Sequence, residues 1–599
     1  MGDFSILVRT LVLLSALVAV GAEEGRTIVE NGSSDWVRLT PSGELAYHED
    51  EKGNRLPDFS WVGYHAGERA IPRVPVRRTL TPSGGDDTRA IQDALDEIGR
   101  LTVGEEGLRG ALLLKSGTYR VDGQIRIRHS GLVLCGEGSG EDGTVLVAAG
   151  HGEPADKRAL IVVGERDGQA VRLDQESRRE ITDSFVPIGA RQFRVSSAKG
   201  YAVGDKIVVY RPGTGEWIHH IGCDEIPSRW GKVWDTYWKR SGDGRGFYYR
   251  RAGISGHQRI SLRAGESWEQ FQQRIRRRLD DDGNRLDFTR QWRPGSYDMH
   301  FERRIVAVDG DRVSIDAPLV HGLDQRFGGG AIFHYSSPGR VREVGVESLR
   351  LISEFGPASE GHPYGAPDQR RSAELHGWHG VVLECNTRDT WVRDVAGNYF
   401  GWSLVSARGV GATVTDCVSF GHASRIAGGR RYPFMTDGQL NLFQRCAAVS
   451  GRHEFVVQAR TWGPNVFVDC LGVDSKSSAG PHHRYGVGTL YDNVSSEHYM
   501  ESRWRGNSGT GHGWAGAQTV FYNCTAPKFH VQAPPGGMCW VIGSGPADSS
   551  ERKPVRPASL YYQQLKERLG SEAVYRLTEP EFLRTLGAYH WAPGSLRPD

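Results

Sequence analysis

The sequence predicts an all-β protein that folds as a right-handed parallel β-helix, a solenoid whose coils stack along one axis. The first observation is a pattern that recurs through residues 381–530, in which an apolar or aromatic run is followed by one polar residue and then by Cys or Val. The second is its spacing, because the repeats end 22, 29, 24, 24 and 30 residues apart, at Val395, Cys417, Cys446, Cys470, Val494 and Cys524. These units have the length of a solenoid coil, and their β-branched and aromatic content argues against pairs of helices.

The polar residue before each Cys or Val marks the expected corner between two strands of one coil. It is Asp, Asn or Arg, at positions 394, 416, 445, 469, 493 and 523. Asp and Asn tolerate left-handed backbone and bond to their own backbone, so they suit a corner. We expect the cysteines that follow to stack as small apolar core residues. Disulfides between them are the alternative in an oxidising compartment, and the lack of CxxC or Cys/His ligand spacing argues against zinc.

The N-terminus has the features of a secretory signal peptide over residues 1–22. Arg9 precedes an apolar run at 11–19, and Val20-Gly21-Ala22 supplies small residues for a cleavage site. The apolar run is too short to span a bilayer comfortably, and no later stretch is long and apolar enough. We therefore expect a secreted or periplasmic protein with no membrane insertion after signal removal.

Composition narrows the class of partner. The net charge is +2, so no global field favours nucleic acid or an anionic membrane. The 78 glycines fit a fold with many tight turns. The 16 tryptophans are typical of proteins that stack sugars on aromatic faces, although a large core would use them equally well.

Two segments precede the insertion. Residues 23–80 are polar and contain several prolines, which predicts an extended segment that packs on the main body. Residues 81–151 begin with a helix that Asp87 can cap, and its apolar stripe of Ile91, Ala94, Leu95 and Ile98 is expected to pack on the first coils. Short strands separated by glycine turns complete those coils.

Three further segments follow. Residues 152–340 interrupt the coils with strands at 203–210 and 304–311, which predicts a β-rich insertion that walls one side of a cleft. Residues 341–540 form the main parallel β-helix. In the C-terminal capping segment 541–599, an amphipathic helix at 557–569 is expected to hide the edge of the solenoid.

Several short motifs carry a resemblance to a known family. They are GDDT at 85–88, AIQ at 90–92, SGTY at 116–119 and GEG at 136–138. Together with the repeats, they resemble the N-terminal cap and coils of the pectate-lyase-like β-helix superfamily, over roughly 80–150 and 340–530. The resemblance implies the fold and a secreted protein that acts on polysaccharide. The superfamily hosts lyases, hydrolases, transferases and phage adhesins, so the reaction does not follow from the fold. Neither the calcium-binding Asp cluster of pectate lyases nor the paired-Asp signature of polygalacturonases is found.

Chemically active side chains recur just before one strand of each later coil. If the coils stack about 4.8 Å apart, these groups form one ladder on one face. The runs are His379, Arg430-Arg431-Tyr432, Arg452-His453-Glu454, His482-His483-Arg484-Tyr485 and His512-Gly513-Trp514. A row of His, Arg and Tyr predicts an anionic partner, namely an acidic polysaccharide or oligosaccharide.

This set suits β-elimination of a uronate-containing polysaccharide. That reaction needs a base, a proton donor for the leaving oxygen and a cation that neutralises the carboxylate. The candidate base is His483 or His453, and the candidate acid is Tyr485 or His482. Arg460 and Arg484 are the candidate neutralising cations, while Arg431, Trp462, His512 and Lys476 complete the candidate substrate-binding set. In the structural alternative, a histidine of the 482–483 doublet bonds a turn carbonyl and Arg430-Arg431 is a solvated corner.

Two other functions fit the same fold. A glycoside hydrolase needs two carboxylates about 5–10 Å apart, and Asp437, Glu454 and Asp474 are the candidates once corner residues are set aside. A non-catalytic glycan-binding β-helix would keep the aromatic and cationic residues. No cofactor or metal ligand is assigned; Ca²⁺ stays open because such sites use scattered carboxylates and carbonyls.

Overall fold

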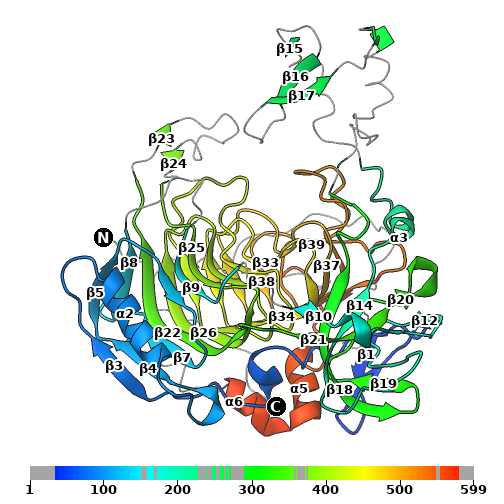
Figure 1. The fold of residues 1–599 in the computed structure, drawn as a ribbon, viewed down its shortest axis with the longest axis horizontal. Helices are drawn as coiled ribbons and strands as arrows, with labels where there is room; N and C mark the ends of the chain where they lie inside the picture. Colours follow the sequence, from blue (N-terminus) through cyan, green and yellow to red (C-terminus); the bar gives the residue numbers. More distant parts are fainter. Residues whose placement is uncertain are drawn as a thin grey trace.

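The computed structural model describes residues 34–149, 158–166, 171–226, 289, 291–356, 375–547 and 553–578, with short pieces at 239–240, 246–250, 257–261, 265–267, 269–270, 359–360 and 371–372. The predicted signal peptide lies outside the described residues. The chain forms a long solenoid of stacked coils with an antiparallel insertion near one end (Figure 1). None of the described helices is long and apolar enough to cross a membrane.

The coils are built from three ladders of parallel strands. The first ladder contains β3 (Val76–Leu80), β4 (Gly110–Leu114), β7 (Leu132–Cys135), β22 (Val341–Ser353), β26 (Thr387–Asn398), β28 (Thr413–Thr415), β31 (Leu442–Gln444), β34 (Trp462–Val468), β37 (Gly486–Asp492), β40 (Gly516–Tyr522) and β42 (Cys539–Ile542). The second contains β5 (Gly117–Val121), β8 (Thr144–Ala148), the distal parts of β22 and β26, β29 (Val418–Phe420), β32 (Ala447–Val449), β35 (Leu471–Val473) and β38 (Ser495–Ser496). The third, a separate sheet, contains β6 (Ile125–Ile127), β9 (Ala159–Val163), β25 (His379–Leu383), β27 (Ser403–Ala407), β30 (Phe434–Thr436), β33 (Phe455–Val457) and β36 (Gly480–Pro481). A further parallel pair, β39 (Met500–Ser502) and β41 (Phe529–Val531), follows β36. The predicted right-handed parallel β-helix is confirmed.

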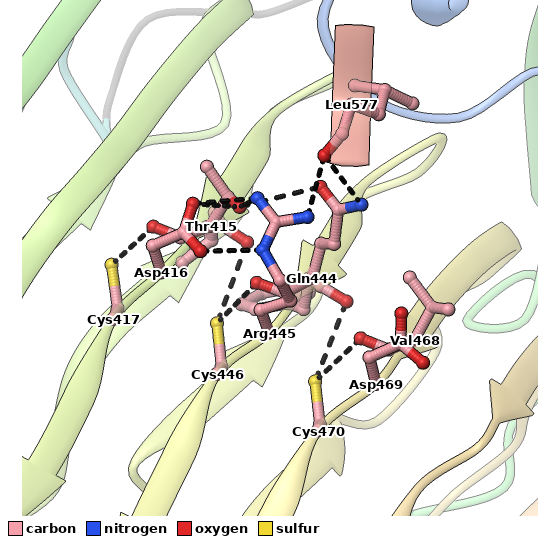
Figure 2. A network of polar contacts seen from close by, with 12 residues as sticks. Thr415, Asp416, Cys417, Gln444, Arg445, Cys446, Val468, Asp469, Cys470 and Leu577 are labelled. Carbon is pink, nitrogen blue, oxygen red and sulfur yellow. Dashed lines mark hydrogen bonds and ion pairs between the residues drawn. The ribbon is translucent and has the colours of Figure 1, made fainter. Parts of the chain in front are cut away.

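The corners between the first two ladders have the backbone that the sequence predicts. All six corner residues adopt left-handed φ: 53° at Asp394, 56° at Asp416, 49° at Arg445, 53° at Asp469, 53° at Asn493 and 50° at Asn523. Their side chains then bond between coils. Arg445 pairs with Asp416 at 2.6 Å, and the Asn493 amide donates to Asp469 at 3.3 Å (Figure 2). Local turn preference and coil stacking therefore agree at each corner.

The cysteines are core residues, as predicted. Cys417, Cys446, Cys470 and Cys524 are free and buried, and they begin the second strand of successive coils. Beside them runs an inner aromatic stack of Phe443, Phe467, Tyr491 and Phe521, with ring centroids 4.7, 5.2 and 5.1 Å apart. Equivalent residues stack because parallel in-register coils bring them to the same place.

The outer face of the first ladder is also buried. Its outward residues are apolar, and they pack against the N-terminal segment and α5 (Leu560–Leu569) in one cluster that includes Leu442, Val466, Leu490, Val520 and Trp540. This corrects the expected place of the C-terminal helix. It lies along the side of the solenoid, over middle coils, where Asp492 accepts from the Tyr561 N–H at 2.7 Å. An apolar sheet face needs a cover, and the helix provides it.

The N-terminal half of the described chain adds a hairpin and a helical cap. β1 (Val37–Leu39) pairs with β2 (Leu45–Tyr47), and η2 (Tyr64–Gly67) follows. α2 (Thr88–Gly99) buries Ile91, Ala94, Leu95 and Ile98 against the first coils, as the apolar stripe predicts. Asp87 holds the N-cap position, but its carboxylate accepts from the Ser83 N–H and not from the helix.

The insertion is an antiparallel sheet that packs back on the solenoid. Its strands run in the order β10 (Arg172–Leu173), β21 (Ala331–Ser336), β14 (Lys206–Arg211), β18 (Met299–Asp309), β19 (Arg312–Ile315) and β13 (Gln192–Arg194), and β11 (Arg179–Glu180) also pairs with β21. Smaller elements are β9-following η4 (Gln175–Ser177), α3 (Gly215–His220), η6 (Gln325–Phe327), and the pair β12 (Phe185–Val186) with β20 (Leu323–Asp324). The core of the insertion includes Tyr485, Val487 and Ala517 of the late coils. The insertion therefore leaves the chain at early coils and docks on late ones (Figure 1).

Candidate functional site

The candidate site lies on the outer face of the third ladder, at its late coils. Phe434 and Phe455 point into the solenoid core, whereas Met435 and Val456 belong to a separate outer cluster with Tyr432. Because side chains alternate along a strand, Tyr432 and His453, each two residues before such a phenylalanine, belong to the strand approaches on this face. The structure thus places the predicted runs of successive coils side by side.

Four histidines, His453, His482, His483 and His512, form what is called here the histidine cluster. Ring centroids lie 4.7 Å apart for His453 and His482, 4.8 Å for His482 and His483, 5.2 Å for His482 and His512, and 5.1 Å for His483 and His512. Tyr432 packs against His453 at 5.1 Å and His482 at 5.2 Å. Residues from four coils and one loop therefore meet at one place.

Hydrogen bonds hold these rings in defined orientations. His453 Nδ1 lies 2.7 Å from the Ser478 carbonyl oxygen. His482 Nε2 lies 3.2 Å from the Tyr432 hydroxyl, and His482 Nδ1 lies 3.1 Å from His483 Nδ1. The Arg505 guanidinium donates to the His482 carbonyl at 2.5 Å, which fixes the backbone beside the rings.

Arginines surround the cluster and keep its imidazoles neutral. Burial lowers the pKa of His453 well below its usual range, and Arg452 lowers it further. The pKa of His482 is lowered by burial and by the neighbouring histidines and Arg505. The pKa of His483 is lowered by burial, then by Arg484, His512 and Arg505. These three rings are therefore free bases at neutral pH, next to fixed positive charge.

Two predicted cations reach this region beside the insertion. The Arg460 guanidinium lies 4.9 Å from the Tyr297 ring centroid and donates to the Gln291 carbonyl at 3.1 Å. Arg484 donates to the Thr510 hydroxyl, and burial lowers the pKa of its guanidinium. Each guanidinium is half-buried or exposed, so both keep donors for an anionic ligand.

Tyr485 does not belong to the candidate site, and its predicted role as acid is wrong. It is 1% exposed, and its hydroxyl lies 3.2 Å from His321 Nε2 inside the insertion interface. Its ring packs on Trp217 at 5.0 Å between centroids. Trp462 is also packed against the insertion core. The docked insertion covers both residues, which sequence spacing alone could not reveal.

Other predicted residues are occupied elsewhere. The Arg431 guanidinium donates to the Ser424 carbonyl at 2.7 Å, and Lys476 pairs with Asp474 at 2.5 Å. His379 lies 2.7 Å from the Ser403 hydroxyl and stacks on Trp402 at 5.2 Å, earlier on the same face. These three positions extend or flank the outer face but do not contact the histidine cluster through any of these bonds.

Sequence reasoning missed the residues that support the cluster. Glu501 is 1% exposed, accepts from the Ser478 hydroxyl at 2.8 Å, and pairs with Arg503 at 2.7 Å and Arg505 at 3.6 Å. It orients arginines beside the site. The Met500-Glu501-Ser502 strand carried no repeat signal for this role, because its partners come from other coils.

One group among the described residues has the composition of a metal site. His65, Glu343 and Asp389 place ligand atoms within 4.8 Å of one another, at the N-terminal segment and the first ladder. The group is already paired: Tyr64 donates to Glu343 at 2.5 Å, His65 Nε2 lies 2.7 Å from Glu343, and Arg388 lies 3.5 Å from Asp389. It therefore fits an ion-pair network that pins the N-terminal segment better than a metal site.

No family model and no curated protein matches the sequence. Among solved structures, the tailspike protein gp49 from Pseudomonas phage LKA1 is 13% identical, with 73% of this chain and 52% of that chain covered and a TM-score of 0.36. The Gp54 tailspike of Acinetobacter baumannii bacteriophage AP22, in complex with capsular saccharide, is 9% identical, with 79% and 71% covered and a TM-score of 0.22. The family 28 exopolygalacturonase of Yersinia enterocolitica is 9% identical, with 86% and 71% covered and a TM-score of 0.19.

The chain spans about half the length of the LKA1 tailspike chain, at 52%, and 59% of a Geobacillus virus E2 chain. The chain's own three ladders, left-handed corners and helical cap decide the architecture. The fold is that of the pectate-lyase-like β-helix proteins. Since this fold hosts several chemistries, function has to be argued from the site.

Proposed function

We propose that this protein acts outside the cytoplasm on an acidic, uronate-containing polysaccharide and cleaves it by β-elimination at the histidine cluster. The observation that supports this most is the combination of three neutral imidazoles with flanking arginines on one outer face. Neutral imidazoles supply acid–base groups, and the arginines supply positive charge for a carboxylate. Neither requirement involves a metal ion.

The chemistry assigns different tasks to these groups. Elimination removes the proton on the carbon next to the carboxylate, forms a double bond and expels the glycosidic oxygen. Arg484 and Arg460 are placed to bind the carboxylate and stabilise the negative charge that develops on it. An imidazole takes the proton and another group protonates the leaving oxygen, each step being worth about 10²–10⁴-fold in rate.

The carboxylate arrangement gives less support to hydrolysis. Glu454 is 0% exposed, and its oxygens are buried without a hydrogen bond to a described residue. Burial raises the pKa of Glu454 to about 8, so it is largely neutral at neutral pH. Asp474 is tied to Lys476 and Ser450, and Asp437 lies 3.9 Å from Arg408. A glycosidase would need one free carboxylate and one carboxylic acid facing a common space.

The test is a panel of uronate-containing polysaccharides incubated with the purified protein. Formation of unsaturated uronate is followed by ultraviolet absorbance, and new reducing ends are counted in the same samples. A rise in both supports elimination, and its loss in His483→Asn places it at the cluster. The matched control His48→Asn changes an exposed histidine of the N-terminal hairpin region and should keep full activity.

Other outcomes would redirect the proposal. Reducing ends without the ultraviolet signal would establish hydrolysis and reject elimination. Binding without either product would establish a glycan-binding protein. Activity that survives His483→Asn unchanged would place the reaction elsewhere on the molecule.

A further inference from the structure

We infer that Tyr432 and His482 fix the tautomer of His483, so that His483 presents an Nε2–H donor, and not a free lone pair, to a bound substrate. His482 is then a positioning residue between the other two. The tautomer is a property of the free protein, while its use in catalysis rests on the proposed function. The inference replaces the sequence-based expectation that His483 is the base.

The direction of the network is set at Tyr432. The Arg452 guanidinium donates to the Tyr432 oxygen at 3.2 Å, so the hydroxyl proton must point elsewhere. Two acceptors are in reach, the Gly428 carbonyl at 3.1 Å and His482 Nε2 at 3.2 Å. The Gly428 carbonyl already accepts from the Arg430 N–H at 3.0 Å and from Arg452 at 2.5 Å. A carbonyl oxygen has two lone pairs, so the hydroxyl donates to His482 Nε2.

The remaining proton positions follow along the two rings. A neutral imidazole carries one N–H, and His482 accepts at Nε2, so its proton is on Nδ1. That proton points at His483 Nδ1, 3.1 Å away. His483 therefore accepts at Nδ1 and carries its own proton on Nε2. Nε2 makes no hydrogen bond to a described residue, so it is available to a ligand.

His453 has the opposite tautomer, which supplies an internal reference. Its Nδ1 faces the Ser478 carbonyl at 2.7 Å, and a carbonyl can only accept. Nδ1 therefore carries the proton and Nε2 the lone pair. Two histidines of one cluster thus hold the acid and the base form of the same side chain.

The network also balances a full proton transfer. As the C–O bond breaks, the Nε2 proton of His483 goes to the leaving oxygen, the Nδ1 proton of His482 moves to His483, and the phenol proton of Tyr432 moves to His482. The negative charge ends on the Tyr432 oxygen, beside the Arg452 guanidinium. The proton from the carbon next to the carboxylate goes to the base, for which the bare Nε2 of His453 has the right form, and the C–H electron pair becomes the double bond.

The tautomers are measured directly in the full chain labelled with ¹⁵N-histidine, by long-range ¹H–¹⁵N spectra at neutral pH. His483→Asn and His453→Asn assign the two sets of signals. We expect a protonated Nε2 and a bare Nδ1 for His483, and the reverse for His453. A protonated Nδ1 with a bare Nε2 at His483 in the wild-type protein would overturn the inference, and this spectrum requires no substrate.

Tyr432→Phe tests the origin of the tautomer, because it removes only the hydroxyl. His483 should then show both tautomers, whereas the matched control Tyr499→Phe should leave its spectrum unchanged. An unaltered His483 in Tyr432→Phe, with the His453 signals confirming the fold, would remove Tyr432 from the network. If elimination is found, Tyr432→Phe should lower kcat by about 10²–10⁴-fold with little change in KM, and should shift the alkaline limb of the pH profile. Equal loss in kcat and binding would indicate a structural role instead.

Discussion

Replacing Arg445 with Met should destabilise the solenoid at one corner. The Arg445 guanidinium is buried and donates twice to Asp416, at 2.6 and 2.8 Å, and once to the Thr415 hydroxyl at 3.0 Å. It also donates to the Leu577 carbonyl at 2.6 Å, near the end of α6 (Ser571–Thr578) (Figure 2). One side chain therefore joins two coils and the C-terminal helix.

The expected cost follows from what the substitution leaves behind. Asp416 is 2% exposed, so without Arg445 its charge is buried and uncompensated. Breaking a buried pair from one side costs about 3–5 kcal/mol. Because the per-kcal shift falls with chain length, we expect a drop in Tm of roughly 5–10 °C. The cost should shrink as pH falls toward the ordinary Asp pKa of about 3.9, because protonation then removes the unpaired charge.

Urea unfolding and thermal melts of the variant measure this cost. The matched control is Arg194→Met, which breaks a pair with Asp311 in which both side chains are 50% exposed, and which should cost under about 1 kcal/mol. The double variant Arg445→Met with Asp416→Leu should recover part of the loss, because no unpaired charge remains. Equal losses for Arg445→Met and Arg194→Met, or no recovery in the double variant, would refute the reasoning.

Three further predictions concern the site and the core. In an active preparation, His483→Asn should lower turnover about 10²–10⁴-fold, whereas Tyr485→Phe should leave turnover intact and cost about 1–3 kcal/mol, because it removes the hydroxyl beside buried His321; equal activity losses would contradict the placement of Tyr485. Stability should fall as pH drops below about 6.5, because the unfolded chain binds protons that the low-pKa rings of His453, His482 and His483 resist, and His482→Asn should flatten this slope in urea titrations; an unchanged slope would refute it. Burial raises the pKa of the Cys417 and Cys446 thiols, so both should react with a thiol reagent only after unfolding, and rapid labelling of the folded protein would contradict their core position.

Much of the fold could be predicted because its signals are local. A corner needs a residue that tolerates left-handed backbone, and Asp394, Asp416, Asp469, Asn493 and Asn523 satisfy that need by their own side chains. Arg445 joins them without a local preference, through its pair with Asp416 on the preceding coil. The position of α5 was mispredicted, because its amphipathic pattern shows that it covers an apolar face but not which face.

The candidate site could be predicted only in part, since its members act across coils. The His453 and His482-His483 runs were visible as repeated polar residues before strands. Glu501 and Arg505 were not, because nothing in their own segment indicates that they meet Ser478 and the His482 carbonyl.

By itself, the sequence determined the solenoid: coil length, left-handed corners and small apolar residues at the start of the second strand are properties of chain neighbours. Only the tertiary structure decided which side chains face one another. Coil stacking sets the 3.1 Å contact of His482 with His483 beside Tyr432, and the docked insertion withdraws Tyr485 from the outer face. The physical reason is that backbone preferences act over a few residues, whereas acid–base chemistry depends on contacts between residues 50 or more apart, such as Tyr432 with His482 and His321 with Tyr485.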